Sequence, residues 1–166
     1  MSKKVLWTIV VVVAVVAVAV AVFFLGGKTE KNVEGTLEDI MAKVYAGISE
    51  ENLPMMLGNI PLDSESIGNF IGTSEVSFKE AIASESMVGS IAHSVVLVRL
   101  NDAKDADAAV EKIKASVNPR KWICVEASNV IVKSKGDLVI LIMADTEMTS
   151  ESEALAPKLE ANFDNL

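Results

Sequence analysis

The uncharged stretch from Val5 to Leu25 constrains this chain more than any other part of its sequence. As an α-helix, its 21 residues would rise about 31 Å, and the hydrocarbon core of a bilayer is about 30 Å thick. Valine is a poor helix former in water, but a single segment in lipid must satisfy its backbone polar groups internally, and a helix does so. Trp7 and Phe23 stand near the two ends, where aromatic side chains favour the membrane interface. We therefore expect residues 5–25 to form a retained transmembrane anchor in the lipid bilayer.

Other interpretations of this stretch fit less well. A cleaved signal peptide has a shorter apolar region and ends at a small-residue site. Ala19 and Ala21 supply such a pattern, but VFFLGG follows where a polar mature start is expected. A lipoprotein signal needs a cysteine directly after the apolar run, whereas the only cysteine is Cys124. A hydrophobic helix of a soluble protein is the remaining alternative, and the length of the stretch favours a membrane span over it.

The flanking charges bear on the orientation. Lys3 and Lys4 precede the apolar stretch, and Lys28 and Lys31 follow it. Positive charge favours the cytoplasmic side, so the count favours an inside N-terminus by a small margin. The start of the chain is also typical of a signal anchor. We expect a short basic N-terminus in the cytoplasm, a single-pass anchor, a flexible linker, and an extracytoplasmic domain outside the cell membrane, at residues 1–4, 5–25, 26–35 and 36–166.

The domain after the anchor is acidic. From Lys28 onward the chain carries 13 basic and 23 acidic residues, a formal charge of −10. Such a domain is repelled by nucleic acid and by anionic lipid at long range, so no nucleic-acid partner is expected. One cysteine permits no disulfide within the chain, and the stability must come from a packed core.

Hydrophobic periodicity predicts an α+β domain. Helical spacing of apolar residues and strand-like runs alternate along the chain. Strands clustered in pairs indicate an antiparallel sheet of about four to five strands, packed by about three helices. The expected helices are 36–48, 63–72 (one or two turns), 101–118 and 152–163, and the expected strands are 53–62 (an irregular edge), 76–85, 89–100, 123–132 and 137–144.

Residues 89–100 are predicted to lie inside the sheet. Ile91, Val95 and Leu97 share one face of this strand, and Val96 and Val98 are on the other. Both faces are apolar at the centre, as in a strand covered on both sides. The neighbours His93 and Ser94 then point to opposite faces and cannot form a side-chain dyad.

Cys124 and His93 are the residues that invite a chemical role. A structural zinc site needs about four cysteine or histidine ligands, and the chain has one of each. Disulfide exchange needs a second cysteine two residues away. We interpret Cys124, in the apolar run WICV, as buried filler at the start of a strand, and His93 as a hydrogen-bonded core residue. A hydrolase using His93 or Cys124 stays open as an alternative.

Acidic residues gather in two places that precede expected helices. Negative charge there stabilises the helix dipole and the caps. The alternative is a divalent-ion or small-molecule sensing site with these carboxylates or His93 as ligands, although NDAKDAD lacks the EF-hand spacing. No cofactor is expected. The two clusters are Asp102, Asp105 and Asp107, and Asp145, Glu147, Glu151 and Glu153.

A run of basic residues without an acid lies between Glu111 and Glu126. Lysines at a helix C-terminus offset the negative end of its dipole, which is the simpler interpretation. The functional interpretation is contact with phosphates of lipid headgroups or envelope polymers. The candidate residues for this anionic-surface contact are Lys112, Lys114, Arg120 and Lys121.

The second half of the chain resembles a known group of domains. The pieces AHSVVLVR, NPRKWICV and GDLVILIM, within residues 86–143, are similar to a family of extracytoplasmic domains of unknown function in Gram-positive bacteria. Members of that family are often lipoproteins or carry single-span anchors. The resemblance implies an envelope location and an α+β fold, and it implies no activity. This chain lacks the lipidated cysteine of the lipoprotein members.

These observations predict a membrane-anchored, non-enzymatic binding or interaction module. Its expected partner is a membrane-proximal protein or an envelope component.

Overall fold

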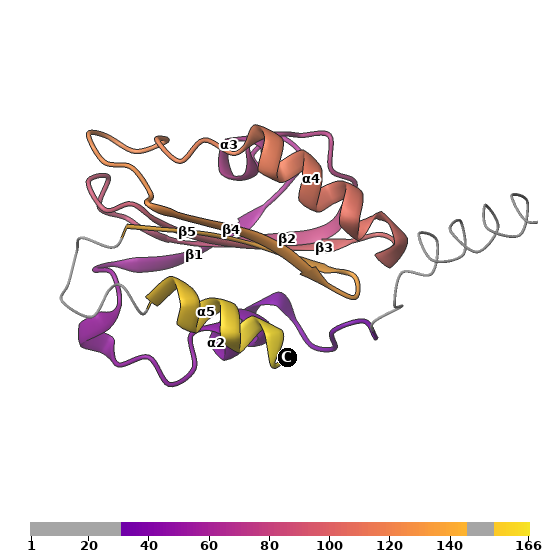
Figure 1. Cartoon of the computed structure of the whole chain (residues 1–166), viewed down its shortest axis with the longest axis horizontal. Helices are drawn as coiled ribbons and strands as arrows, with labels where there is room; N and C mark the ends of the chain where they lie inside the picture. The colour runs from indigo at the N-terminus through magenta and orange to yellow at the C-terminus, as the bar shows by residue number, and fades with distance from the viewer. Residues whose placement is uncertain (1–30, 146–154) are drawn as a thin grey trace, which may run out of the picture.

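The domain is a three-layer sandwich in which one sheet lies between two pairs of helices (Figure 1). The structure is a computed structural model, and it describes residues 31–145 and 155–166. The predicted anchor at residues 5–25 lies outside the described residues. Among the helices of the described part, none is both long and apolar enough to span a bilayer.

The sheet has five strands in the order β1-β2-β3-β5-β4, and every neighbouring pair is antiparallel. This confirms the predicted α+β class and places the doubly apolar strand β3 at the centre. β1 is an edge strand, where Pro61 needs no donor for a ladder bond. The strands are β1 Leu57–Leu62, β2 Phe78–Ser86, β3 His93–Leu100, β4 Asn129–Lys135 and β5 Leu138–Ala144.

The helices cover both faces of the sheet. Helices α3 and α4 lie on one face, and α2 and α5 lie on the other (Figure 1). Thr36 caps α2 by accepting a hydrogen bond from the amide of Asp39 at 3.1 Å. The helices are α2 Leu37–Val44, α3 Gly68–Ile71, α4 Ala106–Ser116 and α5 Leu155–Asp164, with short 3₁₀ turns at Glu50–Asn52 and Ala103–Asp105.

Strand β3 joins the two halves of the core. Val96 and Val98 pack with α3 and α4, and Val95 and Leu97 pack with α2 and α5. All eight of its residues are buried. Burial on both faces explains why the strand is apolar along both of its sides.

The strand register defines two ends of the sheet. We call the end that holds Leu57, Ser86, His93, Asn129 and Ala144 the distal end, since these residues are paired or neighbouring across the five strands. The other end, with the β4–β5 turn, is the proximal end. The backbone of Lys31 abuts Gly136 in that turn, so the described chain begins at the proximal end (Figure 1).

The last part of the predicted linker is packed against the sheet. Val33 is buried, and its amide donates to Asp137 Oδ1 at 3.3 Å. The guanidinium of Arg99 donates to the carbonyl oxygens of Val33 and Gly35 at 2.6 and 2.8 Å. Packing of the domain therefore starts at Val33, three residues before the predicted boundary at residue 36.

Three strands begin several residues later than predicted: β1 at Leu57, β3 at His93 and β4 at Asn129. β4 begins at Asn129, and residues 123–128 form a loop, which corrects the prediction of a strand over 123–132. Cys124 has a φ of +63°, in the left-handed region that a strand residue does not adopt. The apolar residues 123–125 are therefore part of a loop and not of a buried strand.

Candidate interaction surface

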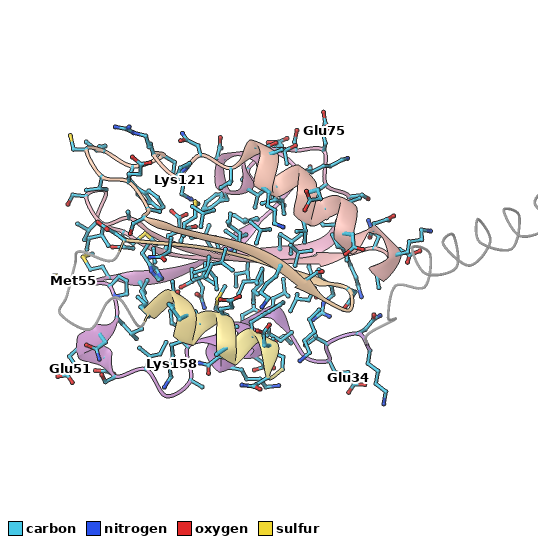
Figure 2. The ribbon with its side chains drawn as sticks, viewed as in Figure 1. Glu34, Glu51, Met55, Glu75, Lys121 and Lys158 are labelled. Atoms are coloured by element: carbon cyan, nitrogen blue, oxygen red, sulfur yellow. The ribbon has the colours of Figure 1, made fainter. Side chains whose placement is uncertain are left out.

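Exposed apolar side chains gather at the distal end of the sheet. They come from three connections that all leave that end: the segment before β1, the turn after β2, and the loop before β4. Figure 2 shows Met55 at this end, on the side opposite to Glu34. The set, which we call the distal surface, is Met55 (68% exposed), Met56 (66%), Met87 (54%) and Ile123 (73%).

The methionines of the distal surface are neighbours through the strand pairing. The amide of Met87 donates to the carbonyl of Met56 at 3.0 Å, which extends the β1–β2 ladder by one step. The hydroxyl of Ser86 donates to the carbonyl of Met55 at 2.8 Å. The methyl end of Met87 covers Gly58, where a β-carbon would overlap it. These contacts tie the backbone of Met55 and Met56 to the distal end of β2, next to Met87.

Ile123 stands on a compact loop formed by residues 117–128. The amide of Ala127 donates to the carbonyl of Pro119 at 2.9 Å, so the two ends of the loop lie close together, as in an Ω-loop. The amide of Ile123 donates to the carbonyl of Gly89 at 3.2 Å and ties the loop to the β2–β3 turn. The loop therefore presents Ile123 beside the turn that carries Met87.

Lys121 anchors this loop from inside. Its ammonium forms an ion pair with Glu85, and the two side chains are only 15% and 16% exposed. It also donates to Ser94 Oγ at 3.3 Å and lies 4.8 and 5.1 Å from the ring centroids of Phe70 and Trp122. Burial lowers the pKa of Lys121, and the ion pair with Glu85 opposes this shift. An ammonium held by a carboxylate and two aromatic rings fixes the base of the loop.

Cys124 is exposed, which corrects the prediction that it is buried. It follows Ile123 at the apex of the loop, and its backbone has a positive φ. A non-glycine residue in this conformation is uncommon and is held by its surroundings. Met56, also at the distal end, has a φ of +54°. The two non-glycine residues with positive φ among those described thus belong to two of the three segments that present the distal surface.

His93 is a core residue, as the sequence predicted. Its side chain is 1% exposed, and its Nε2 shares a hydrogen bond of 2.7 Å with the hydroxyl of Tyr45. Burial lowers the pKa of His93 to about 4, and burial also raises the pKa of Tyr45. His93 faces α2 and α5, while the loop of Cys124 packs on the opposite face with Trp122 and Val125. The structure does not bring His93 and Cys124 together, and the serine beside His93, Ser94, is fully buried.

Of the first predicted acidic cluster, Asp102 and Asp107 stand at helix starts in stabilising roles, while Asp105, at the N-cap of α4, makes no side-chain capping bond. Asp102 accepts from the amide of Lys104 at 3.0 Å and pairs with its ammonium. Asp107 lies in the first turn of α4, where negative charge is favourable. Within residues 31–145 and 155–166, no group of three histidine, cysteine or acidic side chains has the arrangement of a metal site. Glu147, Glu151 and Glu153 lie outside the described residues.

The four predicted basic contacts do not form one exposed group. Lys121 is mostly buried in its ion pair with Glu85. Lys114 pairs with Glu111, and Arg120 pairs with Glu126 at 3.5 Å. Lys112 donates to the carbonyl of Glu75 at 3.1 Å. Contact of Lys112, Lys114 and Arg120 with an anionic surface remains a prediction.

Charged residues around the distal surface are mostly acidic. Glu50 and Glu51 are exposed in the turn that leads to Met55, and Glu51 is seen at this end in Figure 2. Glu126 is on the loop of Ile123 and is half-exposed, where Arg120 offsets it. The distal surface therefore has an apolar centre, and acidic residues lie at its edge.

Comparisons of this chain with protein-family models, with curated proteins and with solved structures gave no match.

Proposed function

We propose that this chain is a single-pass membrane-anchored, non-enzymatic binding module. Its distal surface holds a protein partner that presents an apolar segment flanked by basic residues. The gathering of Met55, Met56, Met87 and Ile123 at one end of the sheet is the observation that supports this function. Contiguous exposed apolar side chains commonly mark sites of protein interaction, and methionine adapts its shape to different apolar partners.

The charges favour a basic partner over a second copy of this chain. Glu50 and Glu51 lie at the edge of the distal surface. The chain from Lys28 onward has a formal charge of −10. Two such surfaces would repel each other, whereas basic residues of a partner would be attracted. The position of the surface also suits a partner away from the entry of the chain, because it lies at the far end of the sheet from Lys31, the first described residue.

The first test is site-specific crosslinking in cells with the full chain. A photoreactive residue is placed at Met87 or Ile123, and a control is placed at Glu111 on α4, which is equally exposed. We expect the same protein to be captured from both distal positions and not from Glu111. Its crosslinked peptide should be apolar with neighbouring lysine or arginine.

The second test measures affinity for the captured protein. Met56→Glu with Met87→Glu should weaken binding by about 10- to 100-fold, since each methionine loses apolar burial and adds an unfavourable charge. The matched control, Ala108→Glu with Ala115→Glu, adds the same charge at exposed positions of α4 and should leave the affinity unchanged. Equal weakening by both variants would contradict the proposal. If the crosslink captures a second copy of this chain, the distal surface is a site of self-association and the proposal of a different protein partner is wrong.

A further inference from the structure

A second charged feature lies at the proximal end of the domain. Three lysines from separate parts of the chain line one hollow of about 460 Å³: Lys31 before α2, Lys43 in the last turn of α2, and Lys135 at the end of β4. Glu34 is the acidic side chain in the lining, and Figure 2 shows it at this end of the molecule. In a strongly acidic domain, this hollow is a local concentration of positive charge.

The lysines of the hollow are available to an anion. Lys31 and Lys43 form no ion pair with any residue that the structure describes. Lys135 donates one hydrogen bond, of 2.6 Å, to the carbonyl oxygen of Asp164, which leaves two of its N–H groups. An ammonium is a good point-charge partner for phosphate.

The hollow also lies close to the predicted membrane. Six residue steps separate Leu25, the end of the predicted anchor, from Lys31, a span of at most about 20 Å. The packing of residues 33–35 through Arg99 and Asp137 fixes where the chain enters the domain. The acidic residues at the edge of the distal surface are about one strand length, about 23 Å, from the hollow. This distance exceeds the screening length of about 8–10 Å in physiological salt, so their charge has little effect on an anion in the hollow.

We propose that this hollow binds the phosphate of an anionic lipid headgroup and seats the domain on the membrane with its distal surface outward. The proposal uses the anchor of the proposed function but not the protein partner. The same chemistry would suit a free phosphate, and the experiment separates the two sources.

The experiment is lysine acetylation footprinting of the full chain, read by mass spectrometry. The chain is reconstituted in phosphatidylcholine vesicles, with or without about 30% phosphatidylglycerol. We expect Lys31, Lys43 and Lys135 to react about threefold or more slowly in the anionic vesicles, with the difference lost in high salt. The exposed Lys158 of α5, which lies away from the proximal end (Figure 2), serves as the internal control and should react equally in both.

Each alternative result is informative. Equal reactivity of the hollow lysines in the two vesicles overturns the proposal. Protection in neutral vesicles by about 0.1 M inorganic phosphate, and none by anionic lipid, assigns the hollow to soluble phosphate and overturns the headgroup source. Failure to insert into neutral vesicles contradicts the anchor, while the protection pattern on anionic vesicles still decides the hollow.

A second measurement uses Cys124, the only cysteine, which is exposed at the distal end. A dye on Cys124 should show less energy transfer to a membrane probe in anionic vesicles than in neutral ones, because seating holds the distal end away. Lys31→Gln, Lys43→Gln and Lys135→Gln together should remove this difference. Lys158→Gln, Ala108→Glu and Ala115→Glu together, which lower the charge by the same amount at exposed positions elsewhere, should retain it. Identical behaviour of the two triple variants overturns the proposal.

Discussion

His93 makes part of the stability depend on pH. It is 1% exposed, and burial lowers its pKa in the folded state from 6.5 to about 4. Because the folded pKa is below the unfolded one, the unfolded chain takes up the proton first as the pH falls. The contribution of neutral His93 is therefore complete above its unfolded pKa and is lost progressively as the pH falls toward its folded pKa.

We expect this residue to lower the free energy of unfolding by about 2 kcal/mol between about pH 7 and about pH 5. His93→Gln offers Tyr45 a polar neighbour that does not titrate, so its stability should fall less over the same interval. Urea denaturation of both proteins at the two pH values measures the difference. An equal fall in both would show that His93 does not titrate in this range.

Gly72 is required by the close approach of α3 to α4. It ends α3 with a φ of +80°, and a β-carbon there would overlap the carbonyl oxygen of Ser116. We expect Gly72→Ala to cost about 2–4 kcal/mol, from the left-handed conformation and the overlap together. Gly68→Ala is the matched control, since its β-carbon would meet no atom nearer than 3.8 Å. Thermal unfolding should show a large loss for the first variant and little or none for the second, and similar losses would refute the steric explanation.

At the scale of elements, the loop of residues 117–128 depends on one buried ion pair. Lys121 and Glu85 are both mostly buried, so removing one partner leaves the other charge without compensation. The loop is also held by the bond from Ile123 to Gly89 and by packing of Trp122 and Val125 against the core, but the ion pair is its one contact between opposite charges in a mostly buried place. The ordering of the loop should therefore follow the ion pair.

Lys121→Met should lower the free energy of unfolding by about 2–4 kcal/mol, because Glu85 would stay partly buried and unpaired. Adding Glu85→Gln should restore most of this loss, and chemical denaturation of the single and double variants measures it. Lys104→Met breaks an exposed pair with Asp102 and should cost at most about 1 kcal/mol. If the double variant is no more stable than Lys121→Met, the uncompensated charge is not the cause.

The sequence predicts the elements well where apolar periodicity is strong. The stripe of α2, the doubly apolar β3 and the edge position of β1 all follow from local pattern, and the structure confirms them. The predicted start of β4 was wrong because ICV has the composition of a strand. The positive φ of Cys124 and the long-range ion pair of Lys121 determine the loop that forms there instead. The burial of Lys121 could not be predicted from the sequence either, because its partners Glu85 and Phe70 are distant from it in sequence.

At the scale of the whole molecule, the two candidate surfaces arise from the register of the sheet. Met55, Met87 and Ile123 are separated by more than thirty residues at each step, and only the strand pairing brings them to one end. In the proximal hollow, Lys135 at the end of β4 is far in sequence from Lys31 and Lys43. Sequence analysis therefore predicted a binding module without locating either candidate surface.

The hydrogen bonds of Arg99 and Asp137 to residues 33–35 affect how the domain responds to a pulling force. Arg99 and Asp137 join the entering chain to the ends of β3 and β5, which run lengthwise between the proximal and distal ends. A pull between a partner and Lys31 would act along these strands, perpendicular to the hydrogen bonds that connect them. The bonds would then be sheared together instead of opening one by one. Tension on the tether would accordingly be resisted by the sheet as a unit.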